Sequence, residues 1–590
     1  MFADSDPGYG FADANRKAKL AAAFPNIDKA IDEEMKQQNV PGLALGVIID
    51  GELAYAKGYG VTDPAAKAAP DADTVYRIGS ISKSFTALAL LALRDDGTLH
   101  LDDPLTRWIP EASGLSYPTH DSPPITLRQL LTHTSGLPRD ADRTKSASEA
   151  VFLAQLAKLP LENPPGRQFV YSNLGFGLLG IVAAHASHGS LQELMAKRVF
   201  GPLGMTSTFW HASEVPHGRL APALLPDGKT LKPDEENIGV AAGAGGIYAS
   251  VRDMARYVAF QLSAYPPRSE ADHGLVHRAT IREAHSTGVL QGGFVQPRGL
   301  AKKGEPAVEF GAASYGFGWA HEVSCNYDDI IEHNGAIESY RAAARFLTDH
   351  GVGFVVLTNF GNANTGAFAQ RAQDALAATG ALETYEMHGK VTPALDATMK
   401  SFLAVYNQWD EPAIKALLAR PLDPREHDEL AGYYKLHGAC TAFELVEVKQ
   451  GMARFKWTCE RGAFEMGVNF VPDGRLGGFA GISRDVTAPP EVKTAANVVL
   501  SLIARWDDRL FARWFNVPQE ARDALKKAGE VIRADAGSCK VKTYVREIVD
   551  WGFEAICEHG PDLRFDLPME GGKIKSVRTH PVKPTTCPIK

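Results

Sequence analysis

Ser80 and Lys83 are spaced as a serine nucleophile and its base would be on one face of a helix. They lie three positions apart at the start of an apolar run rich in helix-forming residues, and side chains at i and i+3 are neighbours. A lysine that burial keeps neutral can take the serine proton, and the helix N-terminus favours a developing oxyanion. About one or two such spacings arise by chance in a chain this long, so an N-cap serine followed by a solvated lysine also fits.

Tyr171 and Asn173 form a second candidate pair, in a loop that leads to a glycine-rich predicted helix. A tyrosine hydroxyl beside a lysine ammonium ionises more easily and can relay a proton between the serine and a leaving group. The asparagine amide can bind both the lysine and a substrate amide. An aromatic anchor beside a turn asparagine would explain the tripeptide equally well, but it is the one Tyr-x-Asn in the sequence.

His333 opens a third motif, which continues through Asn334 and Gly335 to Ala336. A glycine on a strand allows close approach of a substrate backbone, and the N–H of Ala336 can donate if this strand borders the site. Three other tripeptides fit the same loose pattern: Lys302–Gly304, Lys449–Gly451 and Lys527–Gly529. Position favours His333, because it precedes the strongest strand pattern of the chain.

In this order the three motifs resemble those of the serine β-lactamase-like hydrolases of peptidase family S12. That family includes class C β-lactamases, D-alanyl-D-alanine carboxypeptidases, D-aminopeptidases and esterases. The resemblance covers roughly residues 25–385 and extends to four further stretches: Leu130–Leu137, Pro202–Met205, Ala244–Ser250 and Val356–Asn359.

The resemblance implies a fold and a set of roles. The expected fold is an α/β sandwich beside an all-α region, with the site at their junction. Ser80 would be acylated, Lys83 and Tyr171 would share general-base and general-acid work, and Asn173 would orient the substrate amide. His333 would extend the hydrogen-bond network to Tyr171. The N–H groups of Ser80 and Ala336 would form the oxyanion hole, with Asn334 and Gly335 also binding substrate. No metal or organic cofactor is implied.

Two departures from the family pattern bear on the substrate. His333 stands where most β-lactamases have lysine, so a fixed positive charge for a substrate carboxylate is missing. Asn334 stands where carboxylate-binding members usually carry threonine or serine. We therefore expect a peptidase or amidase acting on small peptides without a free carboxylate beside the scissile bond. An esterase of broad acyl specificity is the next alternative, followed by a penicillin-binding receptor or a β-lactamase.

The elements that must position these residues come from both ends of residues 1–390. A hairpin is predicted over Leu43–Ile49 and Leu53–Tyr59, joined by Asp50-Gly51. Further strands are predicted at Tyr315–Trp319, Ala342–Leu347 and Gly353–Thr358, and a helix at Phe368–Ala378. Between them, about 100–257 reads as helical, with amphipathic segments at Ala150–Ala157 and Gly175–Ala186. The order predicts an α/β architecture with a helical insertion.

The last third of the chain contains an internal repeat. Trp409 and Trp506 lie 97 positions apart, Cys440 and Cys539 lie 99 apart, and Cys459 and Cys557 lie 98 apart. One period at three landmarks indicates a duplicated unit, which we place as small α+β modules at 396–487 and 493–590. Predicted hairpins bring Cys440 to Cys459 and Cys539 to Cys557, which favours two disulfides over buried thiols. No pairing is predicted for Cys325 and Cys587.

Composition restricts the partners and the compartment. The 590 residues carry a net charge of −8, which argues against nucleic acid as a partner. No stretch of about 18 apolar residues predicts a membrane span, and the first residues lack the pattern of a signal peptide. The predicted disulfides favour a periplasmic or secreted location over the cytoplasmic alternative.

Overall fold

The computed structural model forms two compact units. The N-terminal unit spans Phe11–Tyr385, and the C-terminal unit comprises Tyr9–Gly10 and the described residues from Glu386 onward. The structure describes the following residues: 9–11, 13–140, 148–225, 230–231, 239–268, 271–272, 274–286, 288–297, 308–324, 327, 329–387, 393–408, 410–421, 424–449, 452–471, 474–484, 488–547, 550–559 and 562–581. Cys325, Cys587 and Lys302–Gly304 lie outside this part of the chain.

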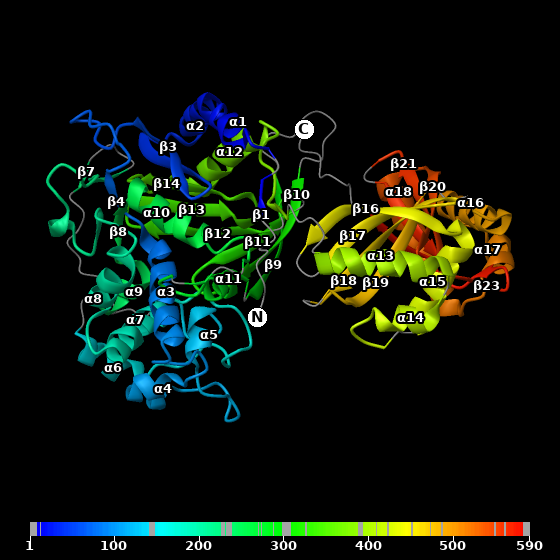
Figure 1. Cartoon of the computed structure of the whole chain (residues 1–590). Coiled ribbons are helices and arrows are strands. Elements are labelled where there is room, and N and C mark those ends of the chain that lie inside the picture. The colour runs from blue at the N-terminus through cyan, green and yellow to red at the C-terminus, as the bar shows by residue number, and fades with distance from the viewer. Residues whose placement is uncertain are drawn as a thin grey trace. The chain divides into compact units, whose positions relative to one another are not determined.

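An eight-stranded antiparallel sheet is the centre of the N-terminal unit (Figure 1). Its strand order is β3-β2-β14-β13-β12-β11-β10-β9, so strands from the beginning of the unit pair with strands from its end. The predicted hairpin is confirmed, because Asp50 and Gly51 both take the positive φ that a tight two-residue turn requires. The strands are β2 (Gly42–Ile49), β3 (Glu52–Gly60), β9 (Val289–Pro297), β10 (Val308–Tyr315), β11 (Ala320–Ser324), β12 (Ile330–Ile337), β13 (Tyr340–Leu347) and β14 (Val352–Thr358).

Helices cover both faces of this sheet. Helices α2 (Phe24–Gln38) and α12 (Thr365–Ala377) pack on one face, and α10 (Val251–Leu262) packs on the other. Every residue of β14 is buried, because the strand is covered on both sides. Its nearly continuous apolar sequence is therefore explained by burial on two faces, and the predicted helix at Phe368–Ala378 is confirmed as part of α12.

The helical region lies on the same side of the sheet as α10. It is built around α3 (Ser82–Asp95) and α7 (Asn173–Ser187) (Figure 1). It also holds a small sheet of β4 (Val75–Arg77), β8 (Tyr248–Ser250) and β5 (Thr208–Phe209), which the sequence did not predict. The remaining helices of the unit are α1 (Arg16–Ala21), α4 (Leu105–Trp108), α5 (Leu127–Leu131), α6 (Glu149–Leu156), α8 (Leu191–Met195), α9 (Ala242–Gly245) and α11 (Arg278–Ser286).

Helix α7 differs from the amphipathic helix that was predicted at Gly175–Ala186. Nearly all of its residues are buried, because α3, α5 and α9 pack around it. Among the described residues, no single helix is long and apolar enough to cross a membrane. One pair, Asn173–Ser187 with Leu191–Phe200, meets the length and composition test jointly but bends by 77° between its members.

The predicted strand at Tyr315–Trp319 is wrong. Strand β10 ends at Tyr315 and β11 begins at Ala320, so the intervening residues form a turn, closed by a hydrogen bond from Gly316 N–H to Trp319 O. Gly318 has φ +77°, and a Cβ there would lie 2.8 Å from Ser84 Cα. The aromatic-glycine alternation therefore serves a close approach of the turn to α3 and not a strand.

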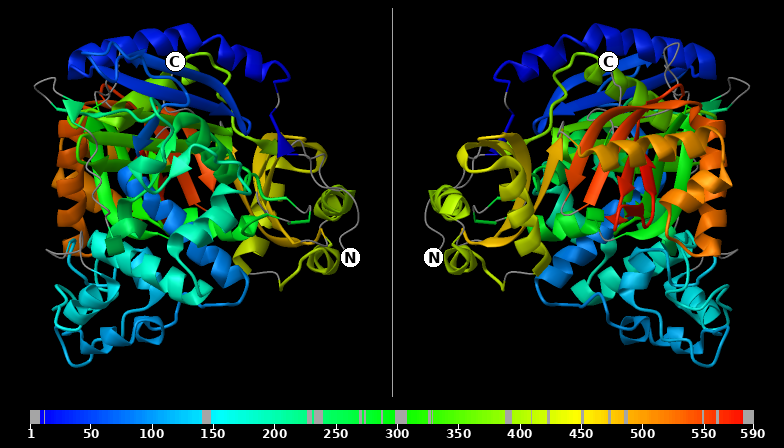
Figure 2. Two further views of the ribbon diagram at one scale, coloured as in Figure 1. Left: turned by 90° about the vertical axis from the view of Figure 1, so that its left-hand side faces the viewer. Right: turned by 90° about the vertical axis from the view of Figure 1, so that its right-hand side faces the viewer.

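The C-terminal unit contains two similar halves, each with three helices followed by four strands. The first half has α13 (Pro393–Gln408), α14 (Glu411–Ala416), α15 (Pro424–His437), β16 (Cys440–Lys449), β17 (Met452–Cys459), β18 (Gly462–Phe470) and β19 (Leu476–Arg484). The second has α16 (Pro490–Ala504), α17 (Asp508–Trp514), α18 (Gln519–Ala536), β20 (Cys539–Glu547), β21 (Asp550–Cys557), β22 (Leu563–Leu567) and β25 (Arg578–Pro581), with a small β23–β24 hairpin (Met569–Glu570, Lys573–Ile574). Figure 2 shows the second half's helices in orange.

Both predicted disulfides are confirmed, Cys440–Cys459 in the first half and Cys539–Cys557 in the second. Each joins the two ends of its hairpin, where the two cysteines are direct cross-strand partners. Strand β19 pairs with β20, so the two four-stranded halves form one eight-stranded sheet.

Candidate active site

Ser80 lies in a single 3-10 turn, η1 (Gly79–Ile81), directly before α3. The predicted helix therefore starts two residues later than expected, but the turn leads straight into it. Strand β12 lies against this turn: a Cβ on Gly335 would lie 1.9 Å from Ile78 O, and one on Gly79 would lie 2.8 Å from Ala336 N. Glycine at both positions allows the backbone of Ala336 to reach the turn that carries Ser80.

Lys83 is completely buried, and its Nζ has three oxygen neighbours. They are Ser80 Oγ at 3.0 Å, Asn173 Oδ1 at 2.7 Å and Ala244 O at 2.8 Å. The two carbonyl oxygens can only accept hydrogen bonds, whereas the serine hydroxyl can also donate. A neutral amine would give its two N–H groups to the carbonyls and keep its lone pair for the Ser80 proton.

The electrostatics of the pocket favour that neutral amine. Burial lowers the pKa of Lys83 well below its usual value, and the nearby Arg139 guanidinium adds to this effect. Asp140 acts in the opposite direction but contributes less. Lys83 is thus suited to accept a proton, which a solvated lysine is not.

The Tyr171 side chain interacts with Ser80. Burial raises the pKa of Tyr171 to about 12, although the interaction with Ser80 acts to lower it. The tyrosine therefore stays protonated in the free protein. This differs from the sequence interpretation, in which a lysine ammonium would make Tyr171 easier to ionise, because the neighbouring lysine is itself shifted towards its neutral form.

Asn173 joins Lys83 to the surface of the protein. Its Oδ1 accepts from Lys83, and its Nδ2 donates to Asp140 Oδ1 at 2.9 Å. Asn173 is the first residue of α7, whose N-cap Ser172 accepts from Gly175 N–H at 2.9 Å. The cap fixes the backbone between Tyr171 and Asn173, so both side chains reach Ser80 and Lys83.

His333 is buried, and its hydrogen-bond partner is Tyr315 and not Tyr171. The Tyr315 hydroxyl lies 3.0 Å from Nε2, and Nδ1 lies 2.8 Å from Asn334 O, which can only accept. Nδ1 therefore carries the proton and Nε2 accepts from Tyr315. Burial lowers the pKa of His333 to about 3, so its ring is neutral. The rings of His333 and Tyr171 are 6.5 Å apart between centroids.

The remaining predicted site residues divide between the two faces of β12. Successive side chains of a strand point to opposite faces, so Asn334 lies on the face opposite His333. The Oδ1 of Asn334 would lie 3.6 Å from a Cβ on Gly366, which belongs to α12. The structure therefore brings the backbone at Gly335 and Ala336 to the Ser80 turn but does not bring the Asn334 side chain there.

Three side chains near this cluster were not assigned a part from the sequence: His133, Arg139 and Tyr315. His133 is buried, has φ +57°, and accepts from Ser172 N–H through Nδ1 at 3.0 Å. Its ring centroid lies 4.3 Å from that of Tyr171. Arg139 lies over the ring of Tyr171, with its guanidinium carbon 5.0 Å from the ring centroid. The sequence signal for His133 was its place in the Leu130–Leu137 stretch; Arg139 and Tyr315 had none.

A model of the Beta-lactamase family matches residues 27–379. The chain belongs to the Beta-lactamase family. The matched range includes every predicted site residue and ends just before the C-terminal unit begins. This confirms the resemblance seen in the three motifs.

Two curated relatives and one solved structure illustrate the similarity. The chain is 34% identical over 281 residues to Beta-lactamase-like protein 2 of Dictyostelium discoideum, covering 45% of this chain and 49% of that protein. It is 35% identical over 259 residues to the D-alanyl-D-alanine-carboxypeptidase/endopeptidase AmpH of Escherichia coli strain K12, covering 42% and 64%. An octameric penicillin-binding protein homologue from Pyrococcus abyssi matches with a TM-score of 0.50 and 20% identity, covering 79% of this chain and 96% of that one.

The chain spans about half to just under two thirds of the length of these curated relatives. The Pyrococcus structure supports the fold, a β-lactamase-like unit with mixed sheet and helices. Among the described residues, no group of three or more His, Cys, Asp or Glu side chains is placed to hold a metal ion.

Proposed function

We propose that the N-terminal unit is a serine hydrolase that forms an acyl-enzyme on Ser80. Lys83 takes the Ser80 proton as the hydroxyl oxygen bonds to the substrate carbonyl carbon. The negative charge on the carbonyl oxygen is stabilised by the N–H groups of Ser80 and Ala336. The observation that carries this proposal is the set of three oxygen atoms around Lys83 Nζ. Of these three atoms, Ser80 Oγ is the one that can donate a proton to the lone pair of the amine.

The second half of the reaction uses the hydroxyl of Tyr171. When the tetrahedral intermediate collapses, the bond to the leaving group breaks and Tyr171 passes its proton to the leaving atom. The proton held by Lys83 restores the tyrosine. Water then attacks the acyl carbon and gives a proton to Lys83. As the bond to Ser80 Oγ breaks, Lys83 returns this proton to the serine oxygen, which restores the hydroxyl and the neutral amine. Asn173 holds Lys83 in place throughout.

We propose small peptides as substrates, cleaved at an amide bond with no free carboxylate required beside it. The neutral ring of His333 supports this choice, because it offers no fixed charge to a carboxylate. Asn334, on the other face of β12, offers no hydroxyl either.

A carboxypeptidase is a second candidate, and Arg139 is the observation in its favour. Arg139 is largely exposed and lies over Tyr171, where it can meet a substrate carboxylate in place of the missing lysine. One relative bears the name of a D-alanyl-D-alanine-carboxypeptidase/endopeptidase. In this alternative the substrate carboxylate binds Arg139, in the loop before α6, and not a lysine on β12.

The test is a substrate screen with wild type and Ser80→Ala. The panel is linear peptides with free or amidated C-termini, D-alanine p-nitroanilide, p-nitrophenyl acetate and nitrocefin. We expect peptide turnover well above nitrocefin turnover, and a loss of several orders of magnitude in Ser80→Ala. Labelling of Ser80 by a fluorescent penicillin or a fluorophosphonate identifies the acylated residue. Full activity in Ser80→Ala would reject the mechanism, and efficient nitrocefin hydrolysis would reject the substrate class.

We also propose a periplasmic or secreted location. The two disulfides of the C-terminal unit support it, since such bonds persist in oxidising compartments.

A further inference from the structure

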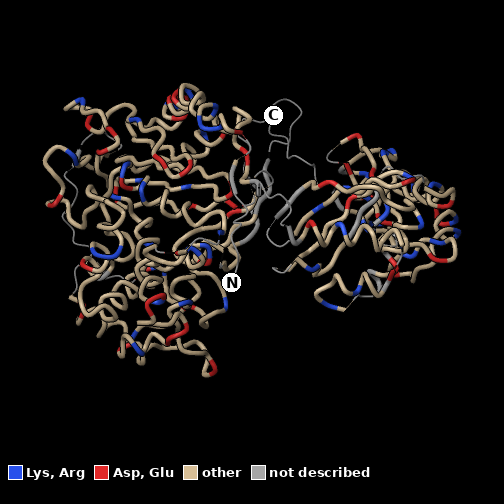
Figure 3. The backbone as a smooth tube through the Cα atoms, viewed as in Figure 1, with Lys and Arg blue, Asp and Glu red and all other residues tan. Residues whose placement is uncertain are grey.

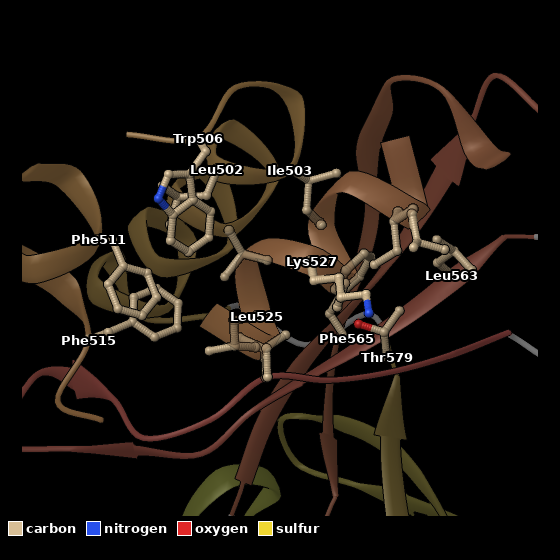
Figure 4. A pocket seen from close by; sticks show the side chains of 17 residues that line it. Leu502, Ile503, Trp506, Phe511, Phe515, Leu525, Lys527, Leu563, Phe565 and Thr579 are labelled. Carbon is tan, nitrogen blue, oxygen red and sulfur yellow. The ribbon is translucent and has the colours of Figure 1, made fainter. Parts of the chain in front are cut away.

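The second half of the C-terminal unit contains an apolar cavity of about 640 Å³. It lies between the three helices of that half and strands β22 and β25 (Figure 4). Protein interiors are normally packed with few voids larger than a water molecule. Pockets that hold small organic ligands have volumes of about 300–1,000 Å³. The cavity therefore has the size of a ligand site and not of a packing defect.

The first half of the same unit shows what a filled version looks like. Two landmarks align the halves: each has one hairpin disulfide, and each has an aspartate that caps its second helix, Asp410 or Asp507. Equivalent positions can therefore be read by counting from these landmarks.

In the first half, aromatic side chains fill the space between helices and sheet. Phe402, Tyr406, Tyr433, Trp457 and Phe464 are all buried. The Trp457 ring lies 5.7 Å from those of Phe402 and Tyr406 and 5.8 Å from that of Phe464, measured between centroids. Tyr433 stacks on Phe464 at 4.7 Å. These contacts form one continuous aromatic core.

Each of these five aromatics is replaced by an aliphatic residue in the second half. The replacements, in the same order, are Val499, Ile503, Ile532, Ala555 and Leu563. The first two precede Asp507 by the same numbers of residues as their counterparts precede Asp410. The next two keep the same separations from the cysteines, and Leu563 faces Ala555 as Phe464 faces Trp457. All but Ala555 line the cavity.

The cavity has an apolar end and a polar end. In Figure 4, Phe511 and Phe515 lie together at one side, and Lys527 and Thr579 lie at the other beside Leu563. Lys527 is the one charged residue of the lining. It is exposed, and the described part of the chain provides it with no ion-pair partner. A ligand that fits both ends has a long apolar body and a negative head.

We propose that this cavity binds a fatty acid anion, with its acyl chain between the helices and the sheet and its carboxylate at Lys527. The chain would occupy the space that Phe402, Tyr406 and Tyr433 fill in the first half. The ammonium of Lys527 and the hydroxyl of Thr579 would each donate a hydrogen bond to the carboxylate. Nothing in this proposal depends on the activity of Ser80.

Calorimetric titration of the full chain with sodium dodecanoate, kept below its micelle concentration, tests the proposal. We expect one site. Dodecanol, which has the same chain without the charge, should bind more weakly, and dodecyltrimethylammonium should bind least. The absence of dodecanoate binding, or tighter binding of the cationic amphiphile, would overturn the proposal.

Variants locate the ligand. Val499→Phe with Ile503→Tyr introduces the first half's own side chains, and we expect at least a tenfold loss of dodecanoate affinity with an unchanged or higher Tm. Lys527→Gln should weaken dodecanoate about three- to tenfold and leave dodecanol unchanged. The neighbouring Lys526→Gln, outside the lining, is the matched control. Undiminished affinity in the double variant would place the ligand elsewhere, and equal effects of Lys526→Gln and Lys527→Gln would remove the carboxylate contact.

Discussion

The hydroxyl of Tyr315 donates a hydrogen bond to Nε2 of His333 over 3.0 Å, at the last residue of β10. This bond fixes the histidine tautomer, because Nδ1 donates to the Asn334 carbonyl at the same time. Tyr315 therefore holds the imidazole beside the site without itself touching Ser80. Tyr315 directly precedes the turn that joins β10 to β11.

We predict that Tyr315→Phe weakens catalysis by about three- to tenfold, because it removes one hydrogen bond of a positioning residue. The fold should persist, since the ring remains. The change should be larger in kcat than in KM. The apparent pKa of the acidic limb of the pH–kcat profile should shift upward, because His333 takes up a proton more easily without this hydrogen bond. An unchanged pH profile would show that the bond serves packing alone.

Replacing Tyr171 with phenylalanine should reduce turnover by about a hundredfold or more. The variant loses the hydroxyl that interacts with Ser80 and the proton for the leaving group but keeps the ring that packs on His133. Stopped-flow kinetics separates acylation from hydrolysis of the acyl-enzyme. Acylation at the wild-type rate would leave Lys83 as the sole proton carrier.

Lys83→Met should abolish activity and raise the stability of the folded protein. Below the unfolded-state pKa of lysine, near 10.4, the unfolded chain holds a proton that burial expels in the folded state. Expelling this proton lowers the free energy of unfolding at neutral pH but has little effect near pH 10.5, where the unfolded chain also loses the proton. The gain in Tm should therefore be several degrees at pH 7 and shrink as the pH rises. A gain independent of pH would show that Lys83 is charged in the fold.

Arg139→Gln distinguishes the two candidate substrate classes. If a substrate carboxylate meets Arg139, the variant should raise KM for peptides with a free C-terminus about tenfold and leave the amidated peptides unaffected. The control is Arg167→Gln, because Arg167 is exposed and forms no hydrogen bond or ion pair with a site residue among the described residues. Equal effects on both peptide sets would assign Arg139 to the electrostatics of Lys83 instead.

Removing one disulfide should cost about 3 kcal/mol of stability, the value expected for closing a loop of this length. The cysteines are separated by 19 and 18 positions, so Cys440→Ser with Cys459→Ser and the matching pair in the second half should cost similar amounts. Denaturant unfolding of both double variants measures the difference. Recovery of all four cysteines as free thiols after non-reducing peptide mapping would contradict the pairing.

The sequence predicted elements whose cause is local and missed those whose cause is a distant neighbour. The residue types Asp50-Gly51 are sufficient to predict the turn. Ser80 and Lys83 are neighbours as predicted, although α3 begins only at Ser82. Gly318 could not be interpreted in the same way, because its reason is the backbone of Ser84. The resemblance predicts Tyr171 as the partner of His333, whereas the hydrogen-bond partner is Tyr315, which belongs to another strand.

The two halves of the C-terminal sheet meet along a short seam. Strands β19 and β20 pair through three residues each, Ile482–Arg484 with Val545–Glu547, whereas β16–β17 and β20–β21 pair along most of their lengths. Amide hydrogens along a seam this short have few neighbours that must open with them. They should exchange with deuterium before those of the hairpins on either side. The boundary between the two repeats would then coincide with the part of the sheet that opens first.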